Sequence, residues 1–207
     1  MQYISFLLIL FLMPGLCYGA ISNAKPIDLN TPVIGSLPKG DTKNFYSFTL
    51  PSAGYIRIDF EHENLTENHR GWRIKVLSED SKDLEYFSSR WNQPEVSSAN
   101  IGLPQGRYYV LVYQEYDVHN SADYSLTVNY TASDFWEKEP NETILAASEN
   151  MLNQAYTGSL NSGKDNDYYS FTLPSAGYIR VDFEHENLTE NHRGWRIKVL
   201  SEDSKDL

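Results

Sequence analysis

Residues 46–61 read YSFTLPSAGYIRIDFE, and this pattern predicts two β-strands joined by a turn. The 55–61 part alternates apolar and polar residues and places Ile56, Ile58 and Phe60 on one face of the chain. A period of two buries one face of a strand and leaves the other in water, as in an antiparallel sheet. The PSAG sequence between the two strands has the composition of a turn.

Short strand-like runs of the same kind follow one another through the first copy of this pattern, separated by turns rich in Pro and Gly. Helix-period patterning is scarce. The run at 107–113, RYYVLVY, is apolar on both faces, which predicts a central strand. About eight short strands with turns between them predict an all-β fold, a β-sandwich. The expected strands cover residues 44–50, 55–61, 72–77, 84–87, 96–101, 107–113 and 124–130.

Residues 46–84 occur a second time at 169–207, with Val181 in place of Ile58 as the only difference. The offset of 123 residues is far longer than a solenoid repeat, so each copy is expected to be a domain. The second copy has no counterpart of the strands after Leu84, which indicates a fragment of a longer protein or an incomplete last domain. The expected division is a first sandwich at 25–131, an acidic linker at 132–143 and a truncated second domain at 144–207.

Residues 1–19 have the features of a signal peptide. An apolar run at 4–13 is too short to span a bilayer as a helix, and small residues precede a cleavage site after Gly19. The alternative is a lipoprotein acylated at Cys17, which the bulky Leu16 fits poorly. No later segment is apolar enough to cross a membrane, so the mature chain is expected to be secreted, extracellular or periplasmic. Its single cysteine excludes a disulfide framework and a cysteine-based zinc site.

The composition excludes several classes of function. The chain has 207 residues, 14% of them aromatic, and a net charge of −11. It is too aromatic to be disordered, and it lacks the basic face that nucleic acid binding requires. Neither HExxH nor GxSxG occurs. His62, His69 and His119 lie among acids, and we interpret the stretch from Glu61 to His69 as a polar loop between strands. Metal or catalytic use of these histidines is the alternative, and no catalytic residue is expected.

The acidic segment EKEPNE follows the first copy and is a candidate calcium site. Period-2 geometry points Glu137, Glu139 and Asn141 the same way. Asp165 and Asp167 precede the next strong strand and could complete the ligand shell. Calcium takes roughly six to eight oxygen ligands, which side chains of these types supply. The alternative is an acidic, solvated linker between domains.

The order of these motifs resembles that of the bacterial pre-peptidase C-terminal domain. The second copy contributes EPN at 139–141, GSL at 158–160 and DNDYYSF at 165–171. The first copy contributes LPQGRYYVLVY at 103–113 and YSLTV at 124–128. The resemblance covers nearly all of residues 31–207. It implies tandem jelly-roll-like β-sandwich domains, the second incomplete, of a kind found in secreted bacterial proteins beside a protease or other exported catalytic domain. Such domains are not themselves catalytic.

Some members of this family, including the collagen-binding domains of bacterial collagenases, bind calcium and a fibrous substrate. The resemblance implies these calcium ligands in the second domain: Glu137, Glu139, Asn141, Glu142 and an aspartate of the 165–167 turn, Asp165 or Asp167. The first copy has Thr42 and Asn44 at the positions of the two aspartates, and only Asp28 in its shorter linker. It is therefore expected to bind calcium weakly or not at all.

A second candidate site is an aromatic face of the 107–113 strand, formed by Tyr109, Leu111 and Tyr113 with Tyr116 just beyond. Tyrosine offers rigid apolar area together with a hydroxyl. In the collagen-binding members, an apolar residue and tyrosines of the equivalent strand contact the ligand, whereas Glu115 here replaces a further tyrosine. The alternative is that these side chains pack inside the sandwich.

These expectations converge on an exported, non-catalytic accessory module. It would bind an extracellular polymer or surface, collagen-like or polysaccharide, or support a neighbouring catalytic domain. The alternative is that the chain is the N-terminal part of a secreted peptidase or other hydrolase whose catalytic domain lies outside these residues. No nucleic acid partner and no membrane span are expected.

Overall fold

The computed structural model describes residues 21–37, 43–63, 71–114, 122–160, 165–185 and 194–203, together with residue 205. It divides into two compact units, Met1–Thr172 and Leu173–Leu207. The expected signal peptide lies outside the described residues. In the parts of the chain that are described, no helix has the length and apolarity needed to span a bilayer. The domain boundaries predicted above remain predictions.

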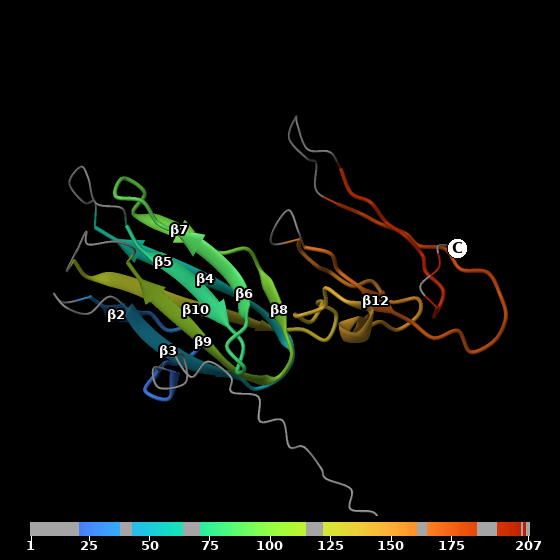
Figure 1. Ribbon diagram of the computed structural model, residues 1–207, viewed down its shortest axis with the longest axis horizontal. Coiled ribbons are helices and arrows are strands. Elements are labelled where there is room, and N and C mark those ends of the chain that lie inside the picture. The colour runs from blue at the N-terminus through green and yellow to red at the C-terminus, as the bar shows by residue number, and fades with distance from the viewer. Residues whose placement is uncertain are drawn as a thin grey trace, which may run out of the picture. The chain divides into compact units, whose positions relative to one another are not determined.

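The first unit contains a β-sandwich made of two five-stranded sheets (Figure 1). In spatial order, the first sheet consists of β1 (Lys25–Pro26), β3 (Lys43–Leu50), β9 (Gly106–Tyr113), β5 (Arg73–Leu77) and β6 (Asp83–Ser88). The second consists of β2 (Val33–Gly35), β10 (Tyr124–Ala132), β4 (Gly54–His62) and β7 (Glu95–Ser97), with β8 (Ile101–Leu103) also paired to β4. The prediction of an all-β sandwich is confirmed.

The core forms where the apolar faces of the two sheets meet. In β4, Ile56, Ile58 and Phe60 are fully buried, and their alternate neighbours face outward. They lie in antiparallel register with β10, which places Val128 opposite Ile58 and Leu126 opposite Phe60. Such cross-strand pairs stabilise a sheet as well as fill the core. The predicted central strand is also confirmed, because β9 lies between β3 and β5.

One expected strand differs in the structure. Residues 96–101 do not form a single strand but divide between β7 and β8, which both pair with β4. The cause is Ser98, whose Oγ accepts a hydrogen bond from Ile58 N at 2.9 Å and donates one to Ala99 O at 2.6 Å. Ser98 N in turn donates to Ile58 O at 2.9 Å. Ile58 N thus donates to a side-chain hydroxyl instead of a backbone carbonyl. The hydrogen-bonded ladder along this edge of β4 is therefore interrupted, as in a β-bulge.

Three further short elements lie outside the sandwich. A single 3₁₀ turn, η1 (Ile144–Ala146), precedes β11 (Ser148–Glu149), which pairs in parallel with β12 (Tyr169–Ser170). In the described part of the second copy, β12 is the only strand. A second sandwich, even an incomplete one, is therefore not seen, and the tandem arrangement stays a prediction.

The second copy exposes apolar side chains that the first copy buries. Phe60 has 0% of its surface exposed, whereas Phe183 at the same position of the repeat has 46%. Local contacts nevertheless persist: the ring centroids of Phe183 and Trp195 lie 5.6 Å apart, the separation also found for the corresponding pair Phe60 and Trp72. The repeat thus keeps its short-range geometry and lacks the cross-strand burial that β9 and β10 supply to the first copy.

This difference can be tested with a matched pair of substitutions. Phe60→Ala should lower the free energy of unfolding of the sandwich by about 3–5 kcal/mol, because it empties a close-packed site. Phe183→Ala changes the same residue in the same local sequence and should alter it by no more than about 0.5 kcal/mol. Denaturant unfolding followed by near-UV circular dichroism measures both. Equal losses in the two variants would show that the second copy is packed like the first.

Candidate metal centre

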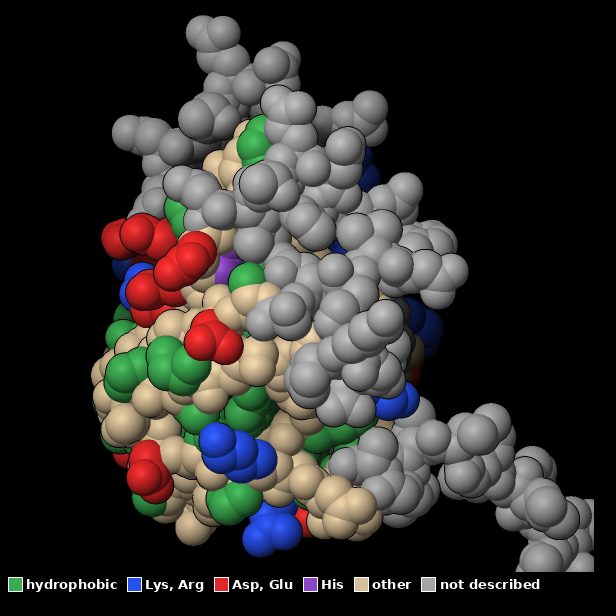
Figure 2. Space-filling model, turned by 90° about the vertical axis from the view of Figure 1, so that its left-hand side faces the viewer, with side chains coloured by type: hydrophobic (Ala, Val, Ile, Leu, Met, Phe, Trp, Pro, Cys, Tyr) green, Lys and Arg blue, Asp and Glu red, His purple; other side chains and the backbone are tan. Residues whose placement is uncertain are grey.

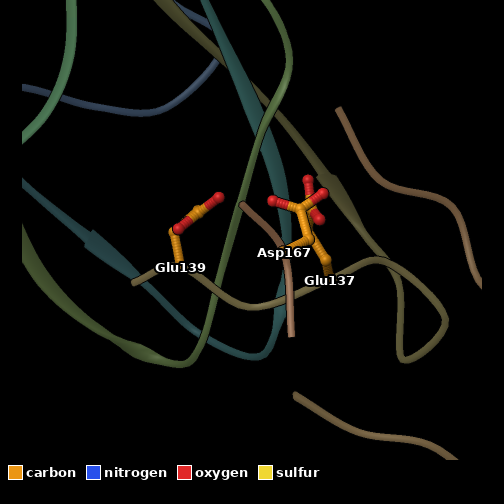
Figure 3. A group of neighbouring side chains, drawn as sticks. All are labelled: Glu137, Glu139 and Asp167. Atoms are coloured by element: carbon orange, nitrogen blue, oxygen red, sulfur yellow. The ribbon is translucent and has the colours of Figure 1, made fainter. Parts of the chain in front are cut away.

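Three carboxylates from two segments meet beside the sandwich. Glu137, Glu139 and Asp167 each offer an oxygen atom, and these atoms lie within 4.8 Å of one another. Figure 3 shows Glu137 and Glu139 arising from one segment and Asp167 from another. Glu137 is 1% exposed and Glu139 is 5% exposed, so both carboxylates are removed from bulk water. Buried carboxylates require a compensating partner, such as a cation or strong hydrogen-bond donors.

The backbone of the acidic segment explains this convergence. Glu137 N donates to Thr157 O at 2.8 Å, and Glu139 N donates to Gly102 O in β8 at 2.9 Å. The segment is therefore held extended, and burial alternates along it: Glu137, Glu139 and Asn141 are buried, while the residues between them are exposed. The common direction of these three side chains agrees with the period-2 expectation.

Gly158 lies against the Glu137 carboxylate. A Cβ atom at this position would overlap Glu137 Oε2 and the hydroxyl of Tyr169. A glycine is therefore needed for the backbone to approach the Glu137 carboxylate this closely. The approach allows the next residue to bind the carboxylate, and Ser159 N donates to Glu137 Oε1 at 2.5 Å. The GSL motif thus supplies a backbone donor to a buried carboxylate.

The donors in the site do not satisfy all of its oxygens. Glu137 accepts hydrogen bonds from Ser159 N and from the Tyr169 hydroxyl, the latter at 2.7 Å. In contrast, Glu139 Oε1, Asn141 Oδ1 and Asp167 Oδ1 are buried and accept no hydrogen bond from any residue that the structure describes. Buried acceptors are rarely left without a partner in native proteins. An oxygen-binding cation would satisfy all three together.

The electrostatics of the site also favour a bound cation. Burial raises the pKa of Glu139 to about 8, and the negative charge of Glu137 adds to the effect. Burial and the same neighbour raise the pKa of Asp167 to about 8. Burial, followed by the charge of Glu137, also raises the pKa of the Tyr169 hydroxyl. The carboxylates repel one another, and a divalent cation would remove that repulsion.

The donor set fits calcium in type. Three carboxylates and one amide oxygen, with no sulfur or imidazole, are ligands of a hard cation. Of the other predicted ligands, Glu142 is exposed and lies outside the cluster. Asp165 also lies outside it, although its charge contributes to the raised pKa of Glu139. Tyr169 and Ser159 were not predicted, because their part in the site depends on contacts between distant segments.

The first copy has a neutral network at the corresponding place. Asn44 and Tyr46 stand where the second copy has Asp167 and Tyr169. The hydroxyls of Tyr46 and Tyr124 share a hydrogen bond of 2.7 Å, and Asn44 Nδ2 donates to the Tyr124 hydroxyl at 2.7 Å. A phenol therefore occupies the position that the Glu137 carboxylate takes beside Tyr169. The expectation of weak or absent calcium binding here remains a prediction.

The predicted aromatic face lies on the outside of the sandwich. Val110 and Val112 point into the core, which leaves Tyr109, Leu111 and Tyr113 on the opposite side of β9. Tyr109 is buried there, and the other two are half-buried. Tyr109 is therefore shielded from solvent, and the use of these side chains as a binding face stays a prediction. Tyr116 lies outside the described residues, so its position is not assigned.

The histidines show a packing role where the structure describes them. The His62 ring packs at a tilt against the rings of Phe60 and Trp72, at centroid distances of 6.2 and 4.7 Å, and its Nδ1 lies 2.6 Å from Glu63 O. In Figure 2, acidic side chains lie beside a histidine on the face turned towards the viewer. The acidic cluster described above contains no histidine. His69 and His119 lie outside the described residues.

No family model matches the chain. Half of the chain is similar to solved structures. One is the pre-peptidase C-terminal domain of a collagenase from Bacillus anthracis, at 31% identity over 51% of this chain and 94% of that one, with a TM-score of 0.41. Another is the periplasmic inhibitor of g-type lysozyme, PliG, from Aeromonas hydrophila, at 15% identity over 52% of this chain and 96% of that one, with a TM-score of 0.35.

The raised pKa values predict how pH affects stability without a cation. Below about pH 4 these carboxyls are protonated in both states. As pH rises towards about 8, the unfolded chain ionises first, while Glu139 and Asp167 retain protons in the folded state. The folded state then binds more protons, so its stability falls with rising pH. Thermal melts in chelator should therefore show a melting temperature that declines from about pH 5 to 8.

Excess calcium should abolish most of this decline, because bound cation replaces the protons. The control is the Glu139→Gln, Asp167→Asn double variant, which should show a flatter pH profile in chelator. A wild-type profile with the same slope in chelator and in calcium would contradict the assignment of a cation site.

Proposed function

We propose that the chain is an exported, non-catalytic accessory module of the pre-peptidase C-terminal type, with a calcium ion held by Glu137, Glu139, Asn141 and Asp167. The observation that carries this proposal is the set of three buried oxygens left without a hydrogen bond among the described residues. The order of the motifs in the sequence supports the family assignment. The resemblance also supports export, in keeping with the signal-like residues at 1–19.

The role proposed for the cation is to fix the acidic segment. Glu137 and Glu139 come from the segment that leaves β10, and Asp167 precedes β12. A cation bridging them would join two stretches that also contact the sandwich. One such contact lies between the rings of Trp136 and Tyr55, at 4.2 Å, and another is the hydrogen bond from Ser159 Oγ to Asn100 O, at 2.7 Å. Bound calcium supplies positive charge and coordination here, while the protein supplies the oxygens.

Calcium binding can be measured directly on the full chain. Isothermal titration should give one site, and the same titration with terbium should give luminescence sensitised by the nearby aromatic residues. Asp167→Asn should weaken binding by at least about tenfold, since it removes a charged ligand. Glu142→Gln tests a predicted ligand whose side chain is exposed, and it should bind almost as well as wild type. Glu149→Gln, exposed in β11, is the neutral control.

Calcium should also slow proteolysis of the 133–143 segment in wild type but not in Asp167→Asn. No heat of binding with either ion, together with an unchanged rate of proteolysis, would refute the cation site.

The proposed ligand surface is the outer face of β9. Leu111 lies in register with Phe45 of β3 and Lys75 of β5, so apolar and cationic side chains share one row of the sheet. A row of this kind suits an extended polymer, because it offers rigid aromatic area and hydrogen-bonding groups along one direction. A collagen-like or polysaccharide ligand remains the proposal.

Co-sedimentation with insoluble collagen, chitin, cellulose and cell-wall preparations tests this surface. Leu111→Ser and Tyr113→Ser should each lower retention on the bound polymer by about tenfold with little change in melting temperature, because both side chains are half-buried on an outer face. Thr127→Ala, which lies on β10 in the other sheet, is the matched control. Retention of both variants at the wild-type level would exclude this face as the binding surface.

A further inference from the structure

The outer face of the first sheet is cationic, although the chain as a whole is acidic. The chain has 17 Lys and Arg residues against 28 Asp and Glu residues. The structure describes every residue of β3, β5, β6 and β9, and the charged side chains at their outward positions are four cations and one acid. Glu85 of β6 lies opposite Val76, a core residue, and so belongs to the other side of the sheet. The outward charged residues are Lys43, Arg73, Lys75, Arg107 and Asp83.

The outer face of the second sheet has the opposite balance. In β4, β7 and β10, which are also fully described, the outward charged residues are one cation, Arg57, and three acids, Asp59, Glu61 and Glu95. The excess of positive charge therefore belongs to one face of the sandwich. Salt screens exposed charges beyond about 8 Å at physiological ionic strength. A ligand on the first sheet thus interacts mainly with the cations of that sheet.

One row of side chains across the first sheet places a cation on either side of a tyrosine. Tyr113 of β9 is in register with Lys43 of β3 and with Arg73 of β5. Neighbouring strands lie about 5 Å apart, so the backbones of the two cationic residues are about 10 Å apart. Lys43 is exposed, and Tyr113 and Arg73 are half-buried, so all three side chains present surface to the solvent.

The next row is mainly apolar. Leu111 lies between Phe45 and Lys75, and Tyr86 follows Lys75 in the same row. Lys75 Nζ donates to Asp83 Oδ2 at 2.5 Å, which compensates the charge of this lysine within the face. The positive charge that a ligand meets here therefore comes mainly from the two cations beside the tyrosine.

Ring contacts hold these two cations along the face. Lys43 Nζ lies 5.9 Å from the centroid of the Phe45 ring, and Arg73 Cζ lies 5.8 Å from the centroid of the Tyr86 ring. Cations at this distance from an aromatic face are attracted to it. The contacts restrict the two long side chains before a ligand arrives, and this lowers the ordering cost of binding.

We propose that this face binds a polysaccharide that carries carboxylate groups, an inference that rests on the ligand surface proposed above and names its substrate class. The carboxylates pair with Lys43 and Arg73, and the apolar faces of the sugar rings pack over Tyr113 and Leu111. Arginine suits this ligand, because its guanidinium group binds a carboxylate through two parallel hydrogen bonds. A neutral polysaccharide offers these cations no charge of opposite sign.

A nucleic acid fits this face less well, although it too is a polyanion. Domains that bind nucleic acids commonly have a pI above about 9, whereas the pI of this chain is about 4.8. Single-stranded nucleic acids also need several open rings on which successive bases stack. Tyr86 is exposed on this face, but Phe45 and Tyr113 are half-buried.

Surface plasmon resonance with the full chain over immobilised carboxymethyl-cellulose tests the proposal. Hydroxyethyl-cellulose, which has the same backbone without the charge, is the matched ligand. Wild type should bind the charged polymer at least about fivefold more tightly. This preference should decline as salt rises from about 20 to 500 mM, because salt screens the ionic contacts and counterion release favours binding less.

The double variant Lys43→Gln, Arg73→Gln should lose most of this preference, with a fall in affinity for the charged polymer of about fivefold, since it removes both ionic contacts. Arg57→Gln changes the same residue type on the outer face of β4, and it should bind like wild type. Near-UV circular dichroism that matches wild type confirms that each variant is folded.

Three results would overturn the proposal. Equal affinity of wild type for the two polymers, lost for both in Leu111→Ser, would exclude the carboxylate while leaving the ligand surface in place. Wild-type affinity in Leu111→Ser and in the double variant would exclude the surface and this inference together. Tighter binding of single-stranded DNA or phosphatidylserine vesicles than of carboxymethyl-cellulose would assign the face to another anionic partner.

Discussion

The antiparallel contact between β4 and β10 is the interaction on which the sandwich depends. It pairs nine consecutive residues of each strand, from Gly54 opposite Ala132 to His62 opposite Tyr124. The alternation in β4 buries its apolar residues because the other sheet covers this face and β10 flanks it along one edge. The second copy carries the same alternation, and Ile179, Val181 and Phe183 remain exposed. An amphipathic strand pattern is thus necessary for this fold, but the burial energy comes from all the elements that pack against it.

The repeat also shows how far sequence patterns predict structure. The strands with strict period-two alternation were predicted almost to the residue, because burial on one face leaves a direct mark on the sequence. The division of the 96–101 run was not predicted, since it depends on the Ser98 hydroxyl replacing one rung of the ladder. The exposed state of the second copy shows a different limit. Its local pattern is unchanged, and among the described residues no strand pair like β9 and β10 packs against it.

The candidate metal site likewise combines residues that the sequence pattern predicts with residues that it does not. The alternation of the EKEPNE segment was sufficient to place Glu137, Glu139 and Asn141 together, because an extended backbone turns alternate side chains to one side. The same rule turns Glu142 away from Asn141, and the structure has it exposed. The resemblance to calcium-binding domains had included it. The hydroxyl of Tyr169 and the amide of Ser159 are set by tertiary contacts, so no local pattern could have shown them.

The glycine that admits the Glu137 carboxylate has a counterpart in Gly35, where a Cβ would overlap the hydroxyls of Tyr46 and Tyr124. Each copy therefore places a glycine against a tyrosine hydroxyl, with the Tyr124 phenol beside it in the first copy and the Glu137 carboxylate in the second. The two copies differ in the groups around this glycine, with Asn44 in one and Asp167 in the other. The same backbone corner can thus surround either a neutral hydrogen-bonded pair of phenols or a buried anion.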